Sequence, residues 1–264
     1  MKLLTDRMIA EKDGAIGWIT FNNPARHNAV SLAMWEALLE IVQDYAQDGD
    51  IRVIVVKGAG EKAFVSGADI SEFEEKRSSP ETTRLYNDTA QRASRALKDV
   101  GKPTIVMIRG YCVGGGVSTA LACDLRIAAE GSTFAVPAAR LGLGYEFEGV
   151  RKLVDVVGPS FAREIFYTAR QFTGQEALAM GLVNRLVPVE WLESYVRDYA
   201  ASIAANAPLT VASIKTLVAQ ALKDESQRDT KLCQDVVDRC FNSADYVEGR
   251  QAFMEKRKPK FVGR

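Results

Sequence analysis

Histidine and paired cysteines are almost absent from this 264-residue chain. His27 is the single histidine, and the four cysteines, Cys112, Cys123, Cys233 and Cys240, form no C-x-x-C pair. Zinc sites use closely spaced cysteine and histidine ligands, and disulfide frameworks are typical of short secreted chains. The sequence therefore predicts no metal site and reduced, buried thiols. A solitary histidine without a visible partner is also a weak candidate for catalysis.

An excess of charge and a long apolar run are missing as well. Lys plus Arg and Asp plus Glu both number 34, so no global field attracts nucleic acid or an anionic membrane. The longest weakly polar run, residues 110–123, is too short for a bilayer span, which needs about 20 residues. Residues 1–14 lack the apolar core of a secretory signal. These absences predict a cytoplasmic protein with neither nucleic acid nor membrane as a partner.

The first half of the chain does contain alternating strand-like and helix-like segments. Strands are expected at 15–21, 51–57 and 104–108, and the last two are apolar throughout, which is typical of parallel strands covered on both faces. Helical spacing extends over 31–47 and 81–100. The second half reads as almost wholly helical. We therefore predict an α/β core followed by a helical C-terminal portion.

Two glycine-containing turns stand where extended apolar runs end. The first comprises Ser66, Gly67, Ala68, Asp69 and Ile70, and the second contains Gly110, Gly114, Gly115 and Gly116. The later glycines precede a predicted helix, so their N–H groups belong to an unsatisfied helix N-terminus. If the turns converge, one N–H from each can hold an oxygen that becomes negative during a reaction. The alternative is a tight strand-to-helix crossover in which glycine serves packing alone.

Several ordered motifs, these turns among them, resemble the crotonase superfamily of enoyl-CoA hydratases and isomerases. The similar segments are 61–70, 102–105, 110–116, 124–128, 172–183 and 253–259, which together extend over nearly the whole chain. The resemblance implies an α/β fold with a ββα-superhelix core at 1–190 that holds an acyl-CoA site. It implies a helical portion at 191–264 for trimerisation and active-site covering. A homotrimer or dimer of trimers is expected, with no cofactor beyond the coenzyme A of the substrate.

The resemblance also assigns site residues. The N–H groups of Ala68 and Gly115 would form an oxyanion hole for the thioester. Contacts to the substrate or its CoA portion would come from Arg26, Ala29, Lys62, Ala63, Asp69, Ile70, Gly114, Ser118, Ala138, Phe253 and Lys256. Phe253 and Lys256 would reach a CoA bound to a neighbouring subunit. Plainer interpretations stay open, with Arg26 as a solvated loop charge, Asp69 as a turn residue, and Phe253 and Lys256 as an amphipathic helix end.

The chain departs from the hydratases of this superfamily at two positions. Ser118 and Ala138 stand where those enzymes carry the two glutamates that hold the attacking water. Alanine has no polar group, and an unassisted serine is a poor base near neutral pH. Ordinary hydration by two glutamates is therefore not expected.

Tyr145 and Glu146 are the candidates for proton transfer. Tyr145 stands at a position similar to a tyrosine of methylmalonyl-CoA decarboxylases in the superfamily, although those enzymes carry histidine where this chain has Ala68. Glu146 can act as acid or base if burial raises its pKa, while Glu148 and Glu146 also suit the first turn of a helix.

These patterns lead to three functional hypotheses. The first is an acyl-CoA lyase or isomerase of the enoyl-CoA hydratase family, with a place in fatty acid metabolism, that stabilises an enolate in its oxyanion hole. The second is a malonyl-type acyl-CoA decarboxylase that uses Tyr145. The third is a noncatalytic acyl-CoA-binding protein that kept the fold and lost its acids.

Overall fold

The structure, a computed structural model, describes residues 3–69 and 80–264. It contains two sheets. The larger has the order β1 (Met8–Asp13), β2 (Ile16–Phe21), β3 (Val53–Gly58), β5 (Thr104–Ile108), β7 (Leu125–Ala129) and β10 (Arg185–Val187). The smaller has the order β4 (Ala63–Val65), β6 (Tyr111–Val113), β8 (Thr133–Ala135) and β9 (Phe172–Thr173). Strand pairing is parallel except for β1 with β2 and β8 with β9.

Helices make up the rest of the regular structure. In chain order they are α1 (Leu32–Gln47), α3 (Pro80–Asp99), α4 (Gly115–Ala122), α5 (Phe147–Thr168), α6 (Gly174–Ala179), α7 (Leu192–Ala204), α8 (Pro208–Ala221), α9 (Thr230–Phe241) and α10 (Ala244–Met254). Short 3-10 turns include η1 (Pro24–Arg26) and η3 (Pro137–Leu141). Ser31 caps α1 by accepting the Met34 N–H at 3.3 Å, as the sequence predicts. Gly158, with φ 75°, breaks α5 before Pro159.

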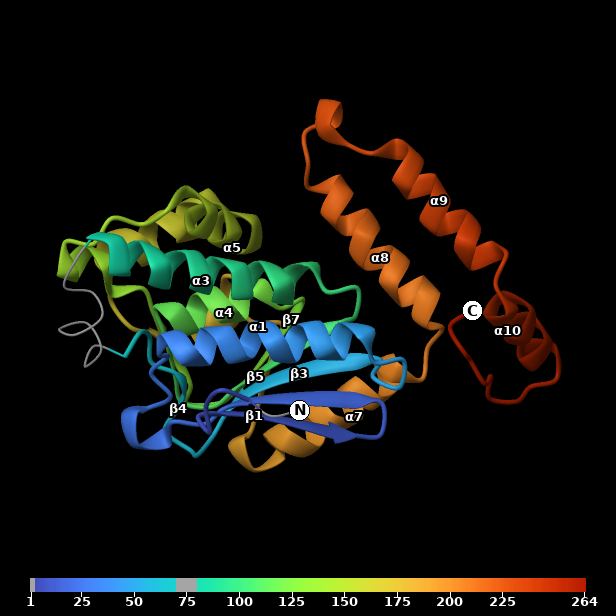
Figure 1. The fold of residues 1–264 in the computed structure, drawn as a ribbon, viewed down its shortest axis with the longest axis horizontal. Helices are drawn as coiled ribbons and strands as arrows, with labels where there is room; N and C mark the ends of the chain where they lie inside the picture. Colours follow the sequence, from blue (N-terminus) through green and yellow to red (C-terminus); the bar gives the residue numbers. More distant parts are fainter. Residues whose placement is uncertain (1–2, 70–79) are drawn as a thin grey trace.

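The larger sheet is covered on both faces, which confirms the prediction made from its uniformly apolar strands. Along β3, Ile54 and Val56 join the core beneath α1, while Val53 and Val55 join a second core beneath α7. Figure 1 shows α1 and α3 on one side of this sheet and α7 on the other. The strand β1 was not expected. Its residues become progressively exposed along the edge of the sheet, so it lacks the apolar pattern of a buried strand.

The last three long helices have a different environment. Figure 1 shows α8, α9 and α10 extending to one side of the α/β core, whereas α7 packs on the sheet through Leu192, Val196 and Ala200. Several large apolar side chains on this extension are exposed, namely Ile214, Val218, Leu222, Phe241, Val247, Phe253 and Met254. Among the described residues no single helix is long and apolar enough to cross a membrane. Only the pair Val189–Ala204 and Pro208–Ala221, bent by 101°, passes such a test together.

The C-terminal tail ties this extension to the core. Asp245, at the start of α10, is buried and accepts the Val262 and Gly263 N–H groups at 2.6 and 2.8 Å. Arg52, just before β3, donates to the Phe261 carbonyl at 2.6 Å and to the Ala204 carbonyl at 3.1 Å. The tail therefore bridges α10 and the large sheet.

Candidate functional site

Two strands of the smaller sheet bring the glycine turns together. β4 and β6 are adjacent and parallel, with Ala63 opposite Tyr111, so their carboxyl ends meet at one edge. A Cβ built on Gly115 would lie 3.7 Å from Gly67 Cα, so the backbones of the two turns lie close together. Neighbouring glycines permit this approach, because a Cβ at Gly116 would lie only 2.3 Å from the Val65 carbonyl oxygen. The predicted convergence of the turns is therefore present.

The backbone around Ala68 is fixed by Val30. The Val30 N–H donates to the Gly67 carbonyl at 2.9 Å, and the Asp69 N–H donates to the Val30 carbonyl at 3.0 Å. In a trans peptide the C=O and N–H point in opposite directions. Because the Gly67 carbonyl faces Val30, the Ala68 N–H of the same peptide faces away from it.

Gly115 supplies a second N–H at the same edge. It is the first residue of α4, and the first helical hydrogen bond is made further on, by the Ser118 N–H to the Gly114 carbonyl at 3.1 Å. The N–H of a first helical residue has no acceptor within its helix. Two backbone donors on converging turns have the chemistry needed to bind one carbonyl oxygen.

Ser118 and Tyr145 are brought together beside these donors. The Ser118 hydroxyl lies 3.0 Å from the Tyr145 hydroxyl, and the Tyr145 ring packs edge-on against Phe166 at 4.8 Å between centroids. Gly149 leaves room for the ring, because a Cβ there would lie 2.6 Å from a ring carbon. Burial raises the pKa of Tyr145, and the hydrogen bond between Tyr145 and Ser118 opposes part of that rise. Tyr145 is therefore a protonated hydrogen-bond donor near neutral pH rather than a base.

The other two candidate positions in this segment, Ala138 and Glu146, supply no buried carboxylate. Ala138 is buried in η3. Glu146 directly precedes α5, is exposed, and accepts a hydrogen bond from Gln91 of α3. Its acid or base role required burial, which the structure does not provide. Glu148 pairs with Arg95 at 2.7 Å, and this hydrogen bond lowers the pKa of Glu148, as suits a first-turn acid.

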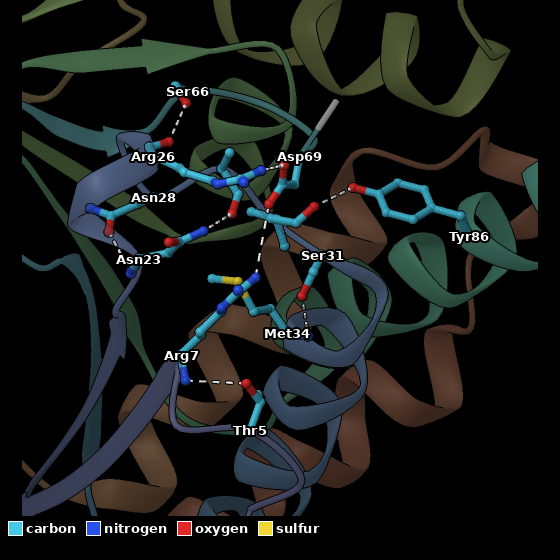
Figure 2. Close-up of polar contacts among 12 residues, drawn as sticks. Thr5, Arg7, Asn23, Arg26, Asn28, Ser31, Met34, Ser66, Asp69 and Tyr86 are labelled. Atoms are coloured by element: carbon cyan, nitrogen blue, oxygen red, sulfur yellow. Dashed lines mark hydrogen bonds and ion pairs between the residues drawn. The ribbon is translucent and has the colours of Figure 1, made fainter. Parts of the chain in front are cut away.

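Arg26 and Asp69 form an ion pair at the end of the first turn. Arg26 Nη1 lies 2.9 Å from Asp69 Oδ1, and Arg7 Nη1 lies 3.9 Å from Asp69 Oδ2 (Figure 2). The Asp69 side chain is only 4% exposed, whereas that of Arg26 is 50% exposed. Arg26 was expected at the substrate by resemblance, and the structure places its guanidinium on a protein carboxylate. Asp69 does more than form a turn, because it joins two segments.

Asn28 holds the Arg26 loop against β4, a role that sequence reasoning missed. Its Nδ2 donates to the Ala59 and Ala63 carbonyls at 2.9 and 2.8 Å, and its Oδ1 accepts the Asn23 N–H at 2.9 Å. The residue is fully buried with φ 55°. Asparagine tolerates this left-handed conformation better than most residues, so an asparagine in this loop was the sequence feature that could have indicated the turn. The neighbouring Ala29 is buried by the same arrangement.

Other predicted contacts are spread more widely. Ala63 is buried at the start of β4, and the Lys62 carbonyl before it accepts the Tyr111 N–H at 3.0 Å. Phe253 is 83% exposed near the end of α10, and Lys256 follows that helix with φ 54°. Figure 1 places α10 at the far end of the chain from β4 and α4, so one chain does not bring these two residues to its own turns. Ile70 lies outside the described residues.

Cysteine and metal chemistry gain no geometric support around the turns. Cys112 is buried in β6, where burial raises the pKa of its thiol. Burial likewise raises the pKa of Cys123 to about 12, so neither is a thiolate near neutral pH. Within residues 3–69 and 80–264 no group of three or more His, Cys, Asp or Glu side chains is placed to hold a metal ion.

Comparison with known proteins places the chain in one family. The family model for "Enoyl-CoA hydratase/isomerase" matches residues 11–264. The chain is 30% identical over 253 residues to the short-chain-enoyl-CoA hydratase of Clostridium acetobutylicum, covering 96% of each chain. It is 34% identical over 249 residues to the methylmalonyl-CoA decarboxylase of Escherichia coli, covering 93% of this chain and 94% of that one.

The fold of the chain is also similar to that of a solved structure. The enoyl-CoA hydratase/carnithine racemase from Magnetospirillum magneticum superposes with a TM-score of 0.94 and 35% identity. The match covers 98% of this chain and 97% of that one. The similarity therefore includes both the α/β core and the helical extension.

Proposed function

Since this chain belongs to the enoyl-CoA hydratase/isomerase family and has the crotonase fold, we propose that it stabilises the enolate of an acyl-CoA thioester. In this proposal the Ala68 and Gly115 N–H groups bind the thioester oxygen, which becomes negative as the enolate forms. Backbone donors that are fixed before the reaction are usually the largest single contribution of such a site. The convergence of the two turns is the observation that carries the proposal.

We propose that the reaction is decarboxylation of a malonyl-type thioester in particular. Formation of an enolate by proton removal needs a base at the α carbon, and the predicted positions offer Ser118, Ala138 and a protonated Tyr145. Decarboxylation needs no base. The bond between the α carbon and the carboxylate breaks and carbon dioxide leaves. The electron pair of that bond stays on the substrate and forms the enolate. A proton delivered to the α carbon then gives the acyl-CoA product.

Tyr145 would supply that proton. Its hydroxyl lies 3.0 Å from Ser118, so Ser118 can hold the phenol in place and pass it a replacement proton from water. A raised pKa keeps the phenol protonated, which is the state that this step requires. The similarity to a methylmalonyl-CoA decarboxylase shows that relatives of this chain include an enzyme with this reaction. The hydratase relatives, one of them also at 34% identity, leave hydration as the alternative.

A comparison of two substrates tests the reaction. Purified protein is incubated separately with methylmalonyl-CoA and crotonyl-CoA, and the thioesters are measured by mass spectrometry. Carbon dioxide release with formation of propionyl-CoA is expected, together with little hydration. Tyr145→Phe should slow turnover by about 10² to 10⁴-fold, the usual contribution of one acid–base group. Lack of turnover of either thioester, despite tight binding, would favour the noncatalytic acyl-CoA-binding protein.

We further propose that the active assembly is a trimer or a dimer of trimers, with residues 191–264 completing a neighbouring site. Phe253 and Met254 are 83% and 81% exposed, although both are large and apolar. Adjacent exposed side chains of this size are usually covered by a partner. In the assembly Phe253 and Lys256 would border the CoA of the next subunit, and no cofactor other than this CoA would be needed.

A further inference from the structure

Asp69 is a buried carboxylate directly after Ala68. Its side chain is 4% exposed, and it follows the turn after β4, the first strand in the order of the smaller sheet. Figure 2 shows Arg26 and Arg7 reaching it from two different segments, η1 and the residues before β1. A buried carboxylate is retained at a cost in desolvation, which is offset only by well-placed partners. The position of this ion pair beside Ala68 therefore calls for an explanation.

The loop that carries Arg26 and the turn that carries Asp69 are also joined through the backbone. Val30, in the loop that carries Arg26, accepts the Asp69 N–H at 3.0 Å and donates to the Gly67 carbonyl at 2.9 Å. The Val30 carbonyl also accepts the Tyr86 hydroxyl of α3 at 2.9 Å (Figure 2). The Ala68 peptide is thus held by backbone bonds on one side and by the Asp69 ion pair on the other.

We propose that Asp69 is a positioning residue that sets the direction of the Ala68 N–H through its ion pair with Arg26. This inference rests on the proposed role of Ala68 as an oxyanion donor. The turn also has backbone bonds to Val30 and His27. In this proposal those bonds do not fix the Ala68 N–H by themselves, so loss of the ion pair changes its distance from the Gly115 N–H. A misplacement of about 1 Å at a reacting group can cost about 100-fold in rate.

The inference changes the role expected for Arg26. A guanidinium that binds the CoA phosphates contributes to affinity, so its loss raises KM. A guanidinium that orients Asp69 contributes in the transition state, so its loss lowers kcat and leaves KM nearly unchanged. The 2.9 Å contact between Arg26 and Asp69 favours the second behaviour.

The test uses Asp69→Asn, Arg26→Gln and the double variant. Asparagine has the size of aspartate without its charge, and glutamine leaves a neutral, shorter hydrogen-bonding side chain at position 26. Glu193→Gln is the matched control, because it also removes one acid from an ion pair. Glu193 lies 3.3 Å from Arg197 in an exposed ion pair on α7, which covers the other face of the large sheet. Thermal unfolding checks that each variant is folded. Arg26→Gln keeps the inference testable if Asp69→Asn fails to fold, since Arg7 still faces the carboxylate.

Two readouts are measured on the full-length protein. One is kcat and KM for decarboxylation. The other is binding of a cinnamoyl-type CoA thioester, whose absorption moves to longer wavelength when hydrogen bonds polarise its carbonyl. We expect both single variants to bind this probe with affinity within about threefold of the unmodified protein, to lose most of the absorption shift, and to lose about 10- to 100-fold in kcat. The double variant should be no worse than either single one, because the two residues act as a unit.

Three results would overturn the inference in distinguishable ways. An unchanged absorption shift and kcat in a folded Asp69→Asn variant would show that the ion pair positions nothing. Weaker probe binding and a raised KM for Arg26→Gln alone would make Arg26 a CoA ligand. Binding of the probe to the unmodified protein without any absorption shift would refute the oxyanion role of Ala68 and, with it, both proposals.

Discussion

Replacement of Gly115 by proline removes one of the two proposed oxyanion donors while sparing the fold. Gly115 is the first residue of α4, a position where proline is favoured and where its missing N–H breaks no helical hydrogen bond. The added Cβ would lie 3.7 Å from Gly67 and 3.8 Å from Trp35, which are ordinary van der Waals distances. The variant therefore changes the proposed chemistry more than the packing.

The size of the effect follows from the number of donors lost. Removal of one oxyanion donor costs about 10² to 10³-fold in kcat, or about 3 to 4 kcal/mol. Gly115→Ala is the matched control, because it adds the same Cβ and keeps the N–H. Its kcat should stay within about tenfold of the unmodified protein, which corresponds to about 1.4 kcal/mol. Gly116→Ala is unsuitable as a control, since its Cβ would lie 2.3 Å from the Val65 carbonyl oxygen.

The assay is steady-state turnover of the preferred thioester, with circular dichroism and thermal unfolding as checks of folding. A kcat of Gly115→Pro within about tenfold of the unmodified protein, as expected for Gly115→Ala, would refute the assignment of the Gly115 N–H. An equal and large loss in both variants would place the defect in packing against Gly67 and Trp35 instead.

Two further predictions concern the missing acids and the assembly. Ser118→Glu combined with Ala138→Glu should raise hydration of crotonyl-CoA, measured by the loss of enoyl absorbance. Hydration by the unmodified protein at an ordinary enzymatic rate, about 1 to 1,000 per second, would instead show that another residue supplies the acid–base groups. Truncation after Asn242 removes α10 and the tail that contacts Arg52, so light scattering should show a smaller oligomer and binding assays a weaker CoA affinity. Phe253→Ala changes a side chain that is 83% exposed, so it should weaken CoA binding without unfolding the chain. A monomeric state of the unmodified protein in light scattering would contradict the proposed assembly.

The fold was largely predictable because its central strands are apolar on both faces. Ile54 and Val55 face opposite cores, as expected for a strand covered on both faces of a parallel sheet. β1 escaped prediction because an edge strand with exposed residues lacks this pattern. β9, with two residues, is too short to leave any periodicity.

The candidate site was predictable where glycine is required and not where partners are distant in sequence. The backbone contact at Gly116 demands the absence of a side chain, and the sequence displays that glycine directly. The contact of Arg26 with Asp69 depends instead on how two loops pack, and the exposure of Glu146 depends on where α5 lies relative to α3. Local sequence carries neither kind of information.

The central claim is that two backbone N–H groups from separate turns hold one thioester oxygen. A crystal structure of the protein with a nonreactive CoA thioester measures this directly. We expect the carbonyl oxygen to lie about 2.7 to 3.1 Å from both the Ala68 and Gly115 nitrogens, with Tyr145 near the α carbon. A carbonyl oxygen more than about 3.5 Å from either nitrogen, or bound by the Ser118 hydroxyl instead, would contradict it.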